Sequence, residues 1–147
     1  MIVTGSPVQA VVDTLKTALD ADPTLDGLVE GVFGHLSETA RVNYPYLVLG
    51  RRHRQNDGGA MGIIGGRVTV QLDGWSDHKG PSEMHTILSR VAAVLERRAL
   101  TVVGYLAIAN SLTCETEEVF FEPDEDKPAT GLYHGVQLWA MDVHEAA

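Results

Sequence analysis

Hydrophobic residues recur at helical spacing near the start of the chain, within residues 6–22. The apolar positions step by three or four residues, and polar residues occupy the opposite side: Val8, Val11, Val12, Leu15 and Leu19. Ser6 is placed to cap this helix, and Pro7 suits its first turn, where a missing N–H costs nothing. Asp22-Pro23 is expected to end it.

A second amphipathic segment follows in the middle of the chain. Its apolar positions repeat the same steps: Met84, Ile87, Leu88, Val91 and Leu95. Gly80-Pro81-Ser82 opens this helix, and the arginines near its end suit the helix dipole. Because each helix is apolar on one side only, both need a sheet to cover.

Strand patterns occupy five segments, residues 31–38, 44–52, 67–75, 102–121 and 131–143. In the third, Val68, Val70 and Leu72 alternate with polar residues, which is the period of a half-buried strand. Several gaps have hairpin length. The sequence therefore predicts an α+β fold, with a mostly antiparallel sheet of about five strands, two main amphipathic helices and a long strand-connecting loop. Residues 1–147 are expected to form a single domain.

That loop, "RRHRQNDGGAMGIIGGR" (51–67), could bind a phosphate, a nucleic acid or a protein. Its glycines match no nucleotide-binding spacing, and no aromatic residue lies among its arginines to stack on bases. A simple hairpin connection explains the glycines but leaves an apolar tip in a polar loop without a partner. We therefore predict a protein contact through Arg51, Arg52, Arg54, Met61, Ile63 and Ile64.

The net charge of −9 repels nucleic acid on average and argues against a sequence-reading DNA binder. Seven acidic side chains lie between Glu115 and Asp126, a run typical of a solvated loop or edge. Alternate strand positions would put Glu115 and Glu117 on one face, with Glu118 beside them.

The last strand is longer than a domain of this size needs for its own sheet. Val136 and Leu138 alternate with Trp139 and Met141, so both of its faces are apolar. We therefore predict that part of this strand works between subunits, with Trp139 and Met141 at the interface. The alternative is that Trp139 is a core residue.

The chain shows no catalytic constellation. Cys114 is the only cysteine, which excludes an intrachain disulfide and a four-thiolate zinc site, and a small core residue is the expected role. The six histidines show no ligand spacing, and neither a nucleophile elbow nor a calcium loop is present. We predict no enzymatic activity, no metal and no cofactor. The N-terminus lacks a signal-peptide pattern. The longest apolar stretch, residues 100–109, is too short to span a membrane, so a cytosolic protein without a membrane partner is expected.

Three segments in this order, "VFGHLSETARVNYPYLVLG", "GGRVTVQLDGWSDHKGPSEMHTILSRVAAVLE" and "LTVVGYLAIANSLTCETEEVFFEPDEDKPATGLYHGVQLWAMDV", resemble the tail terminator (tail completion) proteins of long-tailed phages. The shared features are the N-terminal helix, the strand with Tyr-Pro-Tyr-Leu-Val, Trp-Ser before a helix, and a closing Gly-xxx-Gly strand after an acidic turn. The resemblance covers about residues 7–143.

The resemblance implies a virion protein at the tail–neck junction, assembled in the host cytoplasm. Such a protein forms a homohexameric ring that ends growth of the tail tube, contacts the tail tube protein and a neck or head-completion protein, and lets double-stranded DNA pass without specific binding. Glu115, Glu117 and Glu118 would then make the lumen or its rim negative. Two alternatives stay open: a neck or stopper ring protein, and a small α+β ligand-binding module.

Overall fold

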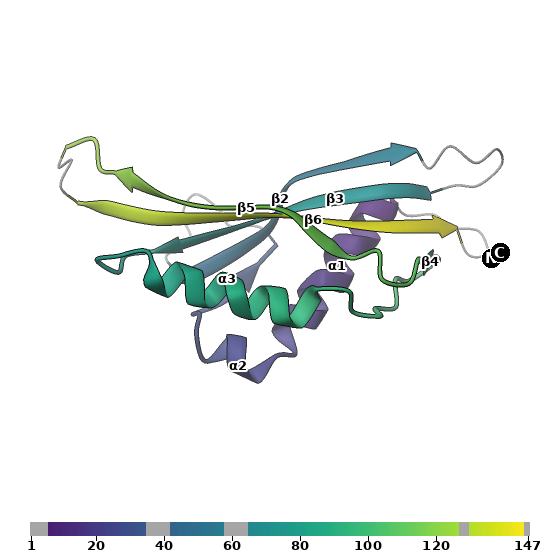
Figure 1. Cartoon of the computed structure of the whole chain (residues 1–147), viewed down its shortest axis with the longest axis horizontal. Helices are drawn as coiled ribbons and strands as arrows, with labels where there is room; N and C mark the ends of the chain where they lie inside the picture. Colours follow the sequence, from purple (N-terminus) through teal and green to yellow (C-terminus); the bar gives the residue numbers. More distant parts are fainter. Residues whose placement is uncertain (1–5, 35–41, 58–64, 127–129, 146–147) are drawn as a thin grey trace.

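A computed structural model of the chain describes residues 6–34, 42–57, 65–126 and 130–145. Within these ranges the elements in chain order are α1 (Pro7–Asp20), α2 (Pro23–Asp26), β1 (Val32–Phe33), β2 (Tyr46–Asp57), β3 (Gly65–Ser76), α3 (Ser82–Leu95), β4 (Tyr105–Ala107), β5 (Thr113–Pro123) and β6 (Gly131–Glu145). Figure 1 shows one twisted sheet with the helices gathered beneath it.

The described strands form a single sheet in the order β1-β2-β3-β6, with both β4 and β5 beside β6. β5 pairs with residues 131–140 of β6, and β4 pairs with residues 143–145 at its other end. All pairings are antiparallel except the short parallel contact between β1 and β2. The predicted α+β class and mostly antiparallel sheet are confirmed.

The helices cover one face of this sheet (Figure 1). α1 packs against β2 and β3, and α3 packs against β3, β5 and β6. The apolar stripes expected from the sequence are buried there, except that Val8 is only half-buried. Val68, Val70 and Leu72 meet the helices from β3 and have no exposed surface. Burial of one-sided apolar stripes is thus what holds the helices on the sheet.

The ends of α1 follow local chemistry. The Ser6 hydroxyl accepts a hydrogen bond from the Val8 N–H, and Pro7 occupies the first helical position, as predicted. The helix ends before Asp22-Pro23, but this pair also starts the short α2, which we did not predict.

Asp22 caps α2 by accepting from the Leu25 N–H and also binds Arg90 of α3 through both carboxylate oxygens. The hydrogen bond from the Arg90 guanidinium is the main reason why the pKa of Asp22 falls to about 2.

The connection between the strands predicted at 44–52 and 67–75 is shorter than expected. β2 continues to Asp57 and β3 begins at Gly65, so Arg54 lies on a strand together with Arg51 and Arg52. The pairing of β2 with β3 shifts between Leu49 and His53, where a bulge absorbs extra residues. Gly50 sits at this shift with φ +89°, a left-handed conformation that favours glycine. Met61, Ile63 and Ile64 lie outside the described residues.

The sequence pattern at 102–121 also proved to be two strands. β4 and β5 are separated by residues 108–112, where Asn110 has φ 60°. The acidic run is the outer strand β5 followed by a turn, in agreement with the expected edge position. None of the helices in the described part of the chain is long and apolar enough to cross a membrane.

Candidate interaction surfaces of the sheet

The sheet face opposite the helices carries most of the polar chemistry. A Cβ added at Gly74 or Gly135 would meet Met84 of α3, so these two positions face the helices. Their neighbours along β3 and β6 therefore face the other way, since strand side chains alternate. Among the described residues no helix covers this second face, which we call the open face (Figure 1).

A row of rings crosses the open face from β2 to β5. Tyr46 stacks on Trp75 with ring centroids 5.3 Å apart, and Trp75 stacks on His134 at 4.5 Å. Phe120 continues the row at 4.8 Å from His134. Rings on neighbouring strands stabilise a sheet through such cross-strand contacts. The row thus ties together the four longest strands on the side that no described helix supports.

His134 in this row lies between two carboxylates. Its Nε2 is 2.7 Å from Asp73 Oδ1, and its Nδ1 is 2.7 Å from Glu122 Oε1. Burial by itself lowers the pKa of His134, but the hydrogen bonds to Asp73 and Glu122 outweigh it, and the net pKa is raised above 6.5. The protonated ring donates from both nitrogens, whereas a neutral ring leaves one carboxylate without a donor.

We expect NMR titration of the His134 ring to give a midpoint above 6.5 in the folded protein. The protonated His134 ring stabilises the folded protein because its pKa is raised on folding. This contribution is fully present below the pKa of the unfolded state and is lost as pH rises through the pKa of the folded state. Glu122→Gln should lower the midpoint and weaken the pH dependence of unfolding, since the carboxylate that favours the charged ring is removed. A midpoint below 6.5 in the unaltered protein would contradict this account.

A shallow groove of about 530 Å³ lies on the open face near the β2 bulge. Its lining residues are Arg51, Arg52, His53, Arg54, Thr69, Gln71 and Leu138. The three arginines are exposed, and the guanidinium carbon of Arg51 lies 5.8 Å from the centroid of the Trp75 ring. Arg52 and Arg54 form no ion pair with any described residue. The predicted arginine contact therefore maps to an accessible, positively charged strand.

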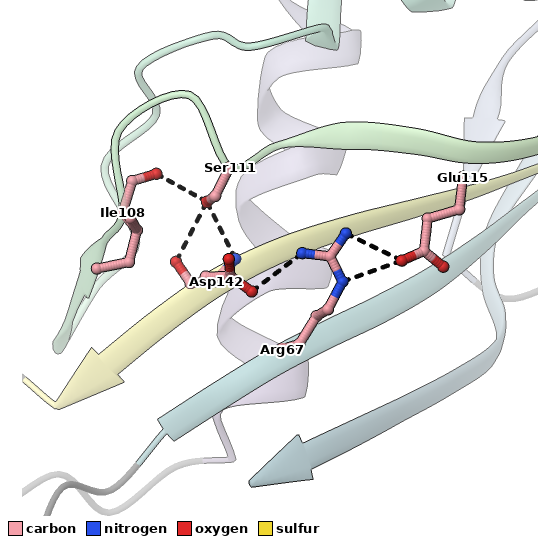
Figure 2. A network of polar contacts seen from close by, with 5 residues as sticks. All are labelled: Arg67, Ile108, Ser111, Glu115 and Asp142. Atoms are coloured by element: carbon pink, nitrogen blue, oxygen red, sulfur yellow. Dashed lines mark hydrogen bonds and ion pairs between the residues drawn. The ribbon is translucent and has the colours of Figure 1, made fainter. Parts of the chain in front are cut away.

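Arg67 of β3 forms the central ion-pair network of the open face (Figure 2). Its guanidinium reaches Glu115 of β5 at 2.9 Å and Asp142 of β6 at 3.1 Å. The Asp142 backbone N–H donates to the Ser111 hydroxyl, which in turn donates to the Ile108 carbonyl at 2.7 Å. The network joins β3, β5 and β6 to the segment that connects β4 with β5.

The expectation that Glu115 and Glu117 share one face is wrong. The pairing of β5 with β6 shifts between Cys114 and Thr116, so Glu115 sits in a bulge and points to Arg67 on the open face. Glu117 instead accepts a hydrogen bond at 2.6 Å from Gln137, which also donates to the Leu88 carbonyl of α3. A bulge reverses the alternation that a regular strand would follow.

The structure also corrects the placement of Trp139 and Met141. Their side chains are 0% and 1% exposed and belong to the core beneath the sheet, which leaves them no surface for a neighbouring subunit. The Trp139 Nε1–H donates to Gln137 Oε1 at 2.9 Å, so the polar edge of this buried ring is satisfied. The alternative interpretation as a core residue holds. Cys114 packs against the same core but is only half-buried, and burial raises the pKa of its thiol.

The local sequence pattern does not reveal the charged centre of the open face. Asp73 and His134 are buried polar residues, yet in the sequence they appear as an ordinary exposed strand position and a scattered histidine. Arg67 appears in that pattern only as the first residue of the strand predicted at 67–75. The signal that could have identified them is the register of β3 against β6, which places Trp75 opposite His134 and Arg67 opposite Asp142.

Comparison with known proteins identifies the family. The family model described as tail completion protein gp17 matches residues 13–138. A search of curated proteins finds no match. A chain in a structure of the virion of a native gene transfer agent particle has the same fold, with a TM-score of 0.79 at 14% identity over 96% of this chain and 99% of that chain. The gp17 protein of bacteriophage SPP1 has a TM-score of 0.56 at 18% identity over 92% and 89%. The chain therefore belongs to the tail completion protein gp17 family, and is a structural phage-tail protein.

Proposed function

We propose that this chain forms a homohexameric ring that caps the tail tube, ends tail growth and joins the tail to the neck. The observation that carries the proposal is the family match over residues 13–138, supported by the shared fold of a chain in a virion particle. In this role the protein needs no catalytic residue, metal or cofactor. Its partners are further copies of itself, the tail tube protein and a neck or head-completion protein.

Genomic DNA passes through the lumen of this ring without tight binding. A net charge of −9 in each copy repels the phosphate backbone, which lets a duplex slide rather than adhere. Glu115 and Glu118 face the open side of the sheet, whereas Glu117 points toward the helix side, where Gln137 contacts it. The acidic lumen or rim of the proposal therefore rests on Glu115 and Glu118.

The proposal predicts closed rings of six copies when the purified protein is concentrated, because cyclic oligomers close through one repeated contact. Native mass spectrometry and electron microscopy measure this directly. Addition of the protein to growing tubes of tail tube protein should stop elongation and leave a ring at one tube end. Rings that bind the portal side and leave tube growth unchanged would support a neck or stopper role instead. A monomer at every concentration, with no effect on tubes, would contradict the proposal.

A further inference from the structure

The sheet ends in two strand edges that no described strand covers. β1 pairs with β2 only at Leu47 and Val48, so residues 51–57 have β3 as their only strand neighbour within the described ranges. On the opposite side of the sheet, β5 pairs with β6 and with no other described strand. Strand edges of this kind present backbone groups that can pair with a strand of another chain.

The two edges carry opposite charge. The β2 edge holds Arg51, Arg52 and Arg54, three of the eleven basic residues of the chain. The β5 edge holds four exposed acidic residues: Glu115, Glu117, Glu118 and Glu122. Charges on an edge strand often serve to block aggregation. Blocking alone would call for the same sign on both edges, because opposite signs attract.

Strand direction also permits the two edges to meet. Three successive antiparallel pairings lead from β2 through β3 and β6 to β5, so β5 runs antiparallel to β2. If copies of the chain are related by rotation about an axis roughly along the strands, corresponding strands point the same way in every copy. The β2 edge of one copy can therefore lie antiparallel beside the β5 edge of the next, which is the usual hairpin-like ladder.

The edges are staggered along the strands. The register places Arg54 opposite Thr69, Thr69 opposite Ala140, and Ala140 opposite Thr113 at the start of β5. From this level β2 residues 55–57 extend away from β5, whereas the length of β5 extends in the opposite direction, so the two edges overlap only in part. A sheet that closes into a barrel needs such a stagger, because its strands tilt against the barrel axis.

We propose that the arginine-bearing edge of β2 in one copy pairs with the glutamate-bearing edge of β5 in a second copy, and that this repeated contact joins the sheets of the ring. The inference rests on the ring proposed above and identifies the surfaces that build it. The contact is head-to-tail, because each copy offers one edge of each kind.

Charge reversal on each edge tests the pairing. Arg52→Glu with Arg54→Glu reverses the β2 edge, and Glu117→Lys with Glu118→Lys reverses the β5 edge. Each double variant should raise the concentration for half-assembly by about tenfold or more, because like charges across an interface are strongly unfavourable. An equimolar mixture of the two should assemble near the concentration that the unaltered protein needs, since reversed edges complement each other in alternating copies. Lys16→Glu in α1 with Lys79→Glu in the segment between β3 and α3 lies away from both edges, is the matched control and should assemble normally.

Circular dichroism and melting temperature establish that each variant is folded. Of the four residues changed on the edges, only Glu117 has a described polar partner, and that partner, Gln137, keeps its bond to the Leu88 carbonyl. Independently, hydrogen exchange of the unaltered protein should show slower amide exchange along residues 51–56 and 116–122 in the ring than in the monomer.

The outcomes separate this inference from the proposed function. Normal assembly of both folded double variants, failure of the mixture to restore assembly, or unchanged amide exchange at both edges would overturn the edge pairing while the ring stands. Absence of any ring in the unaltered protein would overturn the proposed function itself.

Discussion

Replacement of Trp139 by alanine is expected to lower the free energy of unfolding by about 3 to 5 kcal/mol, the usual cost of deleting a buried aromatic ring. The Trp139 ring is fully buried, and it is the largest of the fully buried side chains in the described core. Its Nε1–H also donates a hydrogen bond to Gln137 Oε1, and the Gln137 amide nitrogen in turn donates to the Leu88 carbonyl, which links β6 to α3. Denaturant unfolding followed by circular dichroism measures the loss.

Two further variants show which part of the loss comes from packing. Trp139→Phe keeps much of the ring volume but leaves Gln137 Oε1 without its donor, so a smaller loss of about 1 to 3 kcal/mol is expected. Trp75→Ala removes a ring of the same type from the open face, where it is only half-buried, and should cost less than Trp139→Ala. Equal losses for the Trp139 and Trp75 variants would show that the core assignment is wrong.

Gly135→Leu is expected to destabilise the fold by about 1 to 3 kcal/mol, because it inserts volume between β6 and α3. A Cβ at Gly135 would lie 2.7 Å from Cγ and Sδ of Met84 and 2.9 Å from Cδ1 of Leu88. A Cβ at Gly74, directly opposite on β3, would also meet Met84, so the neighbouring strand offers no space into which this side chain could move.

Gly80→Leu is the matched control for this substitution. A Cβ at Gly80 meets nothing within 4 Å, so the added side chain extends into open space. Thermal unfolding should therefore show a clear decrease for Gly135→Leu and little change for Gly80→Leu. If both variants melt at the temperature of the unaltered protein, α3 does not pack on β6 as closely as the structure indicates.

Both substitutions act on β6 at the covered face of the sheet, whereas the charged edges belong to the outer strands β2 and β5. A variant of the core that remains folded should therefore assemble with unaltered affinity, because Trp139 has no exposed surface. Assembly defects in folded variants are expected instead from the arginines of β2 and the glutamates of β5.

Local pattern was sufficient for the two main helices and for the buried face of β3. The apolar spacing of α1 and α3 identified their buried faces, and Ser6 and Pro7 marked the start of α1, because caps and amphipathic stripes depend on residues within a few positions of one another. Alternation in β3 identified Val68, Val70 and Leu72 as core residues for the same reason. The family could also be identified from the order of the segments.

Tertiary structure alone decided the sheet register, and with it the surfaces. The bulges after Leu49 and Cys114 shift the strand pairing, which places Arg51 over Trp75 and separates Glu115 from Glu117. The cluster of His134, Asp73 and Glu122 joins three strands, so no local spacing could reveal it. Trp139 could belong to a core or to an interface because both environments favour a large apolar ring. The helices that pack on one face of the sheet decided which face of β6 is buried within the chain. Burial depends on what packs against each face rather than on the residues of the strand itself.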